Sequence, residues 1–233
     1  MTELEKPRQL PLDLGHRTGY SRDDLVVSQA NAQAVVLVDR WPDWPAPVVV
    51  LAGPTGSGKS HLAAIWREMS DALSLNASSI EENIAALDGT RPVLIDDADA
   101  GVLDQQGLFH LINQIRGGGA TLMLTARRFP GAWGVTLPDL ASRLKAAATV
   151  EIEEPDDLLL AGVITKLFAD RQIEVDPAVV QYLVRRIERS LSTAIHVVDR
   201  LDRAALEQKT RITRALAAET INAADEGQPE LDM

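Results

Sequence analysis

The spacing of hydrophobic residues changes once along this chain, near residue 155. Before that point, short apolar runs alternate with stretches in which apolar residues recur every three or four positions. Such runs are typical of buried parallel strands, and such spacing is typical of helices. After the charged segment 153–157, the spacing is helical throughout. The pattern predicts an α/β domain, a parallel sheet with flanking helices, followed by a small α-helical lid.

The residue ranges of these elements follow from the same spacing. Ser28 and Asp176 are suitable N-cap residues, and the prolines between 42 and 47 end the first helix. In the first part we expect strands at 48–52, 72–77, 92–95, 121–125 and 149–152, and helices at 28–38, 59–69, 79–87, 108–116 and 137–144. In the second part we expect helices at 158–168, 177–187, 190–207 and 215–224.

A glycine-rich segment links the first strand to the helix that follows it. Residues Gly53 to Ser60 fit G-x-x-x-x-G-K-[ST], the P-loop. Glycines let backbone N–H groups surround a phosphate, Lys59 would reach the β- and γ-phosphates, and the Ser60 hydroxyl would ligate Mg²⁺. A chance glycine-rich turn is disfavoured, because strand, loop and helix occur in the required order. The nucleotide-binding residues expected here are Gly53, Pro54, Thr55, Gly56, Ser57, Gly58, Lys59, Ser60 and His61.

Two acids follow the apolar run at 92–95. The carboxyl ends of parallel strands are where open α/β sheets bind ligands. Asp96 would hold Mg²⁺ through water, and Asp97 would lie near the attacking water as a catalytic carboxylate. Two acids after a strand are often a solvated turn, but downstream of a P-loop they form a Walker B candidate. Thr125, at the tip of the next strand, would act as a sensor that orients water, or would cap the strand end.

Composition limits the possible functions. The chain has 233 residues, 45% of them hydrophobic, and a formal net charge of −11. That charge repels nucleic acid and anionic membranes, so any contact with nucleic acid needs a local basic patch or a partner. The absence of cysteine fits a reducing cytoplasm, and we expect neither a signal peptide nor a membrane span.

The two ends of the chain differ from its middle. We expect a flexible tail at 1–19, a nucleotide-binding α/β domain at 20–154, a helical lid at 155–224 and an acidic tail at 225–233. Within the first tail, Gln9-Leu10-Pro11-Leu12-Asp13-Leu14 has leucines at alternating positions. Such a segment suits an extended peptide that binds an apolar groove, although short patterns of this kind also arise in ordinary tails.

The P-loop, the Walker B strand, the strand ending in Thr125 and the lid together resemble the AAA+ ATPases. The segment from Tyr20 to Ala224 is similar to the bacterial replication initiator DnaA. Residues 24–31 resemble the box that lines its adenine pocket, which implies that Val26 and Val27 bind nucleotide. Residues 137–144 resemble the box with the arginine finger, which implies a catalytic role for Arg143. Residues 189–195 resemble the sensor 2 helix, which implies that Arg189 binds nucleotide.

Arg143 has a simpler alternative, a surface arginine paired with Asp139 four residues earlier. Three positions depart from the initiator pattern. The initiators usually have Thr-Ser-Asp where this chain has Thr125-Ala126-Arg127, and usually have Gly where it has Ser28. The Walker B strand ends in Asp96-Asp97, whereas strong AAA+ hydrolases have Asp-Glu. The shorter second acid suggests slow ATP hydrolysis by the chain alone.

The tail resembles a motif that binds the β sliding clamp of DNA polymerase III, through Gln9, Leu10, Leu12 and Leu14. With the chain ending after the lid, the whole is similar to the Hda family, DnaA-related negative regulators of replication initiation. The resemblance implies ADP or ATP with Mg²⁺ as ligands, DnaA and the clamp as partners, and DNA contact only through the clamp. An autonomous ATPase such as a helicase loader, or an origin-binding protein, is the alternative. Which nucleotide is active, and whether the chain forms a homo-oligomer, stay open.

Overall fold

A computed structural model describes residues 22, 25–84, 87 and 89–225, with backbone only for 223–225. The expected clamp-binding residues Gln9 to Leu14 lie outside the described residues. In the described part, no helix is long and apolar enough to cross a membrane.

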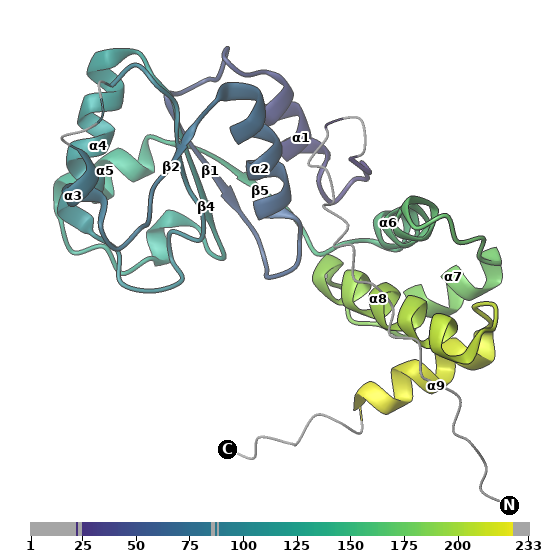
Figure 1. The fold of residues 1–233 in the computed structure, drawn as a ribbon. Helices are drawn as coiled ribbons and strands as arrows, with labels where there is room; N and C mark the ends of the chain where they lie inside the picture. The colour runs from purple at the N-terminus through teal and green to yellow at the C-terminus, as the bar shows by residue number, and fades with distance from the viewer. Residues whose placement is uncertain (1–21, 23–24, 85–86, 88, 226–233) are drawn as a thin grey trace, which may run out of the picture.

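A five-stranded parallel sheet forms the centre of the first domain (Figure 1). Its strand order is β2-β3-β4-β1-β5, so the P-loop strand β1 lies between β4 and β5. All residues of β1 and β4 are buried, as their uninterrupted apolar runs predict. The strands are β1 (Val48–Ala52), β2 (Leu73–Ser74), β3 (Val93–Ile95), β4 (Leu122–Ala126) and β5 (Ala148–Glu151).

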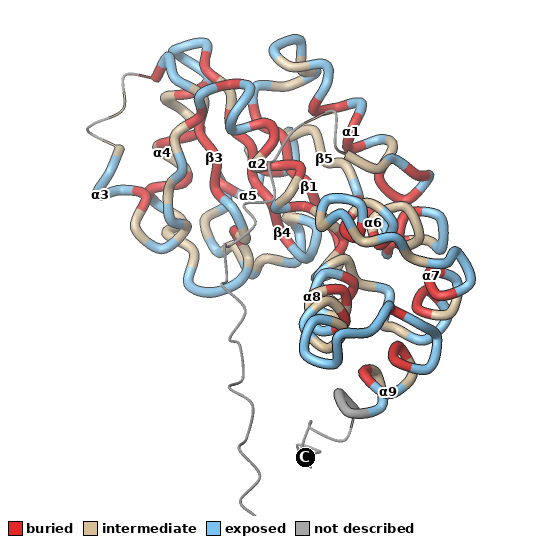
Figure 2. The backbone as a smooth tube through the Cα atoms, turned by 45° about the vertical axis from the view of Figure 1, so that its right-hand side comes forward, coloured by how far each residue is buried: buried red, intermediate tan, exposed pale blue. Residues whose placement is uncertain are grey.

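Helices cover both faces of this sheet. Alternate strand residues point to opposite sides, so Val50 and Leu124 pack with α3, α4 and α5, whereas Leu51 and Met123 pack with α1 and α2. Burial along the tube in Figure 2 follows this layering. The helices are α1 (Ala32–Asp39), α2 (Lys59–Ser70), α3 (Ile80–Ile84), α4 (Gln105–Gly118) and α5 (Pro138–Lys145).

The lid has a separate hydrophobic core, built around Leu160, Phe168 and Leu201. Side chains cap three of its helices: Asp156 accepts from the Leu159 N–H, Asp176 from the Ala178 N–H, and Ser190 from the Thr193 N–H. The lid helices are α6 (Asp157–Asp170), α7 (Pro177–Val184), α8 (Leu191–Gln208) and α9 (Arg214–Asp225). The predicted fold class, a parallel α/β domain followed by a helical lid, is confirmed.

Some predicted boundaries were wrong. Ser28 does not cap the first helix, because its hydroxyl accepts from the Ala30 N–H within a turn. Asn31, whose side-chain oxygen accepts from the Ser28 N–H, holds the N-cap position, and α1 begins at Ala32. The predicted strand at 72–77 is reduced to β2, and the predicted helix at 177–187 ends at Val184.

Candidate functional site

The loop between β1 and α2 has the backbone shape that its glycines permit. Gly56 has φ of 76° and Gly58 has φ of 100°, values that residues with a side chain rarely adopt. A β-carbon at Gly56 would lie 2.1 Å from the Ser190 hydroxyl of the lid. The Leu191 N–H donates to the Gly56 carbonyl at 2.8 Å, so the loop and the first turn of α8 are in direct contact.

Lys59 is the first residue of α2 and is only 5% exposed. Its Nζ donates to the Pro54 carbonyl at 2.7 Å, which folds the side chain back over the loop. Burial lowers the pKa of Lys59, and the nearby charges of Asp97 and Asp96 oppose that shift. A buried ammonium at a helix N-terminus is suited to binding a phosphate group.

Ser60, Asp96 and Thr125 form one hydrogen-bonded group at the carboxyl edge of the sheet. The Ser60 hydroxyl donates to Asp96 Oδ1 at 3.2 Å, and the Thr125 hydroxyl donates to the same oxygen at 2.5 Å. Thr125 also accepts from the Asp97 N–H at 2.8 Å, and Asp97 has φ of 52°. Thr125 is fully buried, so it fixes the direction in which both acids leave the strand.

The oxygens of Ser60 and Asp96 fit a magnesium ion. Mg²⁺ prefers oxygen ligands and usually takes one or two from protein side chains, with the rest from water and phosphates. Among the described residues, no cluster of three or more His, Cys, Asp or Glu side chains could hold a metal by itself. The two predicted metal ligands are therefore in contact, and they suit an ion that arrives with a nucleotide.

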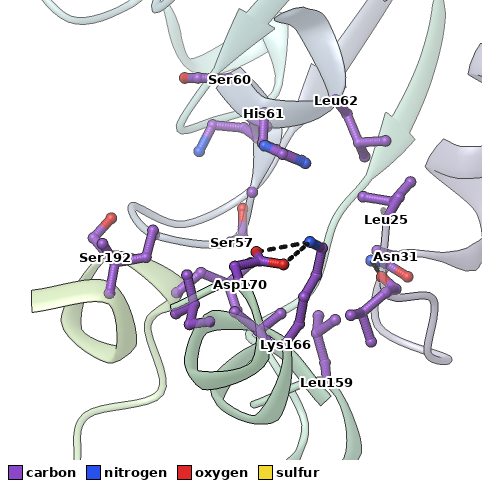
Figure 3. A pocket seen from close by; sticks show the side chains of 18 of the residues that line it. Leu25, Asn31, Ser57, Ser60, His61, Leu62, Leu159, Lys166, Asp170 and Ser192 are labelled. Carbon is purple, nitrogen blue, oxygen red and sulfur yellow. Dashed lines mark hydrogen bonds and ion pairs between the residues drawn. The ribbon is translucent and has the colours of Figure 1, made fainter. Parts of the chain in front are cut away.

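A cavity of about 550 Å³ lies between the P-loop, the residues before α1 and the lid (Figure 3). This volume is typical of small-molecule sites. Its apolar end is formed by residues such as Leu25, Leu159 and Val163, and its polar end by the glycine-rich loop. Ser57 lines the cavity with a buried hydroxyl that has no hydrogen-bond partner. An apolar wall for a base beside a loop for phosphates fits a nucleotide.

The structure places the predicted nucleotide-binding residues unequally. Residues 56–61 and Val26 line the cavity, and Val26 packs so closely on α6 that a β-carbon at Gly162 would lie 2.7 Å from its Cγ1. Gly53, Pro54 and Thr55 belong to the loop but do not line the cavity, and Val27 is 44% exposed outside it.

Arg189 also lies outside the cavity lining. Its guanidinium donates to the Asp157 carboxylate at 2.7 Å and to the Pro155 carbonyl at 3.2 Å, and its side chain is 52% exposed. These bonds attach the start of α8 to the start of α6. In this arrangement the predicted sensor arginine joins two parts of the lid.

The lid brings charged residues that the sequence analysis missed. Lys166 and Asp170, one turn apart on α6, form an ion pair of 2.8 Å at the cavity (Figure 3). Arg171 also lines the cavity, donates to the Leu167 carbonyl at 2.7 Å and pairs with Asp199. Each charge is thus paired with a neighbour in the lid. Their spacing on α6 was readable from the sequence, but nothing in the sequence showed that this face meets the P-loop.

Asp99, in the α/β domain, is a further residue that the sequence did not reveal. Its side chain is almost fully buried, and its two oxygens accept from the Arg127 N–H at 2.8 Å and the Arg128 N–H at 3.1 Å. The carboxylate therefore holds the turn after β4 against the turn after β3. This contact supports the position of Thr125, two residues before Arg127.

Arg143, on α5, has an unusual environment for a cation. Its Nε is buried and has no hydrogen-bond partner, and its guanidinium carbon lies 5.5 Å from the centre of the Phe109 ring. With Arg116 it lines a second cavity of about 380 Å³. Among the ion pairs of the described residues, none joins Arg143 to Asp139, so the alternative of a surface pair does not occur.

Comparisons with known proteins agree with this architecture. A family model described as the lid domain of Hda matches residues 163–220. An uncharacterized protein of Haemophilus influenzae is 25% identical over 197 residues, which cover 77% of this chain and 84% of that protein.

Two solved structures share the fold. Domain III of the Thermotoga maritima replication initiation protein DnaA has a TM-score of 0.73 at 16% identity, covering 88% of this chain and 96% of that chain. The RuvB Holliday junction branch migration motor of Thermotoga maritima has a TM-score of 0.72 at 18% identity, covering 91% and 75%. The chain therefore shares with these two proteins the fold of a parallel α/β domain followed by a helical domain.

Proposed function

We propose that this chain, whose lid matches the Hda lid model and whose fold is shared with domain III of DnaA, is a nucleotide-bound negative regulator of replication initiation. In this proposal it binds ADP or ATP with Mg²⁺ between its two domains. It attaches through its N-terminal tail to the DNA-loaded β sliding clamp, in the cytoplasm. There it contacts ATP-bound DnaA and promotes ATP hydrolysis by that partner.

Nucleotide binding is supported by the cavity and its polar end. Lys59 is buried where phosphates would lie, and the glycines at positions 56 and 58 leave the backbone N–H groups uncovered by side chains. Ser60 and Asp96 would hold the magnesium ion, which neutralises phosphate charge when bound. In this proposal Asp97 would lie near the attacking water, and Thr125, which accepts from the Asp97 N–H, would hold the turn that carries it.

The observation that carries the proposed effect on a partner is the environment of Arg143. A guanidinium with a buried Nε and no hydrogen-bond partner there is costly unless a ligand completes it. Arg143 is on α5, which packs on α4 rather than beside the P-loop or the lid (Figure 1). A phosphate that reaches Arg143 would therefore come from a neighbouring molecule. By resemblance to AAA+ assemblies, that neighbour is DnaA with bound ATP.

An autonomous ATPase is the second candidate, and the group around Asp96 favours it. Ser60, Thr125 and Asp97 form a complete hydrogen-bonded set in a single chain, so the site has the parts needed for hydrolysis. Against it, Asp97 has a shorter side chain than the glutamate expected for a strong hydrolase. This makes slow turnover without a partner the expected behaviour.

One experiment separates the two candidates. ATP hydrolysis would be measured with DnaA, this protein, the β clamp and DNA in every combination. The regulator proposal expects little hydrolysis by the protein alone and strong hydrolysis only when all components are present. Hydrolysis at a motor-like rate by the protein alone would favour the autonomous ATPase. A second set with Gln9, Leu12 and Leu14 changed to Ala tests the tail, because loss of stimulation with unchanged nucleotide affinity is expected.

A further inference from the structure

Two short segments of the lid carry positive charge and no acid. Residues 182–186, at the end of α7, contain Arg185 and Arg186. Residues 209–214, which run from the end of α8 to the first residue of α9, contain Lys209, Arg211 and Arg214. All of these side chains belong to exposed residues. We call them together the lid basic surface.

Tyr182 brings the two segments together. The guanidinium carbon of Arg186 lies 5.7 Å from the centre of its ring, and that of Arg214 lies 5.0 Å from the same point. Figures 1 and 2 both place α9 at the end of the lid remote from the sheet. The lid basic surface is therefore separate from the nucleotide cavity and from Arg143.

This arrangement gathers like charges on one exposed surface. Among the ion pairs of the described residues, none involves a member of the lid basic surface, whereas Arg171 and Arg189 in the same domain both pair with acids. Arg214 also stands in the first turn of α9, where the positive end of the helix dipole disfavours a cation. Like charges gathered without counter-charges indicate an anionic ligand.

We propose that the lid basic surface binds the phosphate backbone of duplex DNA. Guanidinium groups pair with phosphates through two parallel hydrogen bonds, and four of these five side chains are arginines. The apolar side chains of the two segments, Leu183, Val184 and Ile212, are buried. The surface thus lacks the apolar anchor that an acidic protein partner would need. The Tyr182 ring already contacts two guanidinium groups, which favours backbone contact over stacking of bases.

Because the overall charge is −11, the lid basic surface would also orient the protein on DNA. DNA is repelled by most of the molecule and attracted at one end of the lid, so binding there fixes the orientation of the protein on the duplex. This inference does not depend on the proposed regulation of DnaA, because it requires neither the clamp nor a partner.

Binding of the full chain to a fluorescently labelled duplex of about 20 base pairs tests the proposal. Fluorescence anisotropy would be measured at several salt concentrations from about 50 mM to 200 mM. We expect Arg186→Glu/Arg214→Glu to weaken binding at least tenfold and to lower the salt slope by about 2, since each lost phosphate contact removes about one unit. The matched control is Arg40→Glu/Arg67→Glu, two exposed arginines on the α/β domain with the same change in net charge.

The outcome is clear in each case. Equal weakening by the control pair, or no binding by the unaltered protein at about 50 mM salt, would overturn the proposal. Tighter binding to single-stranded than to duplex DNA would overturn the choice of the duplex backbone. Because Arg186 and Arg214 pack on Tyr182, Lys209→Glu/Arg211→Glu provides a second variant in the loop before α9. It should weaken binding in the same direction, and thermal unfolding measures separately the cost of an acid at the C-terminal end of α8, where Lys209 is the C-cap.

Discussion

The cations at the nucleotide cavity and the cation at Arg143 differ in how their N–H groups are bonded. At the cavity, Lys59 donates to the Pro54 carbonyl, and Lys166 pairs with Asp170. Around Arg143, a buried Nε has no hydrogen-bond partner and the guanidinium lies against a phenylalanine ring. Both sites hold a buried polar atom without a hydrogen-bond partner, Ser57 Oγ at the cavity and Arg143 Nε on α5, but only on α5 does that atom belong to a cation. The difference suggests that the chain binds its own nucleotide in the cavity and acts on a partner through α5.

The largest expected effect is at Arg143. Arginine fingers contribute about 10³–10⁵ to the rate of other NTPases. We expect Arg143→Ala to lower stimulation of DnaA hydrolysis toward the unstimulated rate, while affinity for nucleotide and clamp is unchanged. Arg143→Lys should also fail, because an ammonium does not reproduce the planar fork.

The control for this prediction is Arg116→Ala, which removes a neighbouring cation from the same cavity wall. If stimulation survives Arg143→Ala, the proposed difference between the two sites is wrong. Arg127 or Arg128 would then be the next candidates for the arginine finger. Loss of stimulation in Arg116→Ala alone would assign the arginine finger to Arg116 on α4 instead.

Lys59→Ala tests the other side of the comparison. Removing one partner of a buried charged contact costs about 2–5 kcal/mol, so we expect nucleotide affinity to fall by roughly 30-fold or more. Calorimetric titration with ADP and ATP measures this directly. Unchanged affinity would show that the P-loop interpretation is wrong. Arg143→Ala, which lies outside the cavity, is the control and should bind nucleotide normally.

The pH dependence of binding should also come from Lys59. Burial lowers its pKa in the free protein, and a bound phosphate raises the pKa again. Between these two pKa values the complex holds more protons than the free protein, so affinity falls as pH rises through the lowered pKa. Calorimetry in buffers of different ionisation enthalpy would detect the proton uptake. Lys59→Arg stays charged and should lose this alkaline decline.

The sequence predicted those parts of the site whose residues are adjacent in the chain. The loop at 53–60 and the acids after β3 lie next to strands whose apolar runs were clear, so their place at the sheet edge followed. Lys166 and Asp99 could not be found in this way, because they reach the site only through packing of the lid and of the turn after β4. The prediction that Ser28 caps the first helix was wrong, because its hydroxyl accepts a hydrogen bond inside a local turn. Capping preferences alone do not distinguish these two uses of a serine hydroxyl.

A smaller effect distinguishes the two cations of the lid. Lys166 lines the cavity, whereas Arg189 is outside its lining and bonded to Asp157 and Pro155. We expect Lys166→Ala to lower nucleotide affinity by about 1 kcal/mol, the scale of a partly exposed charged contact. Arg189→Ala should lower it less and should instead reduce the thermal stability of the lid. The reverse order, measured by calorimetry, would indicate that Arg189 leaves Asp157 when nucleotide binds.

The smallest expected effect concerns Gly162, where two opposing terms can be compared. Replacing glycine by alanine inside a helix stabilises it by about 0.8–1.0 kcal/mol. At Gly162 the new β-carbon would lie 2.7 Å from Val26 Cγ1, and overpacking of this kind costs about 1–3 kcal/mol. Gly117, near the end of α4, is the matched control because a β-carbon there meets nothing within 4 Å. We therefore expect Gly117→Ala to raise the unfolding free energy and Gly162→Ala to leave it equal or lower. Because Val26 lines the cavity, Gly162→Ala should also weaken nucleotide binding by less than about tenfold, whereas Gly117→Ala should not. Equal stabilisation by both changes, with unaltered affinity, would mean that the lid and the residues before α1 are not held in contact in solution.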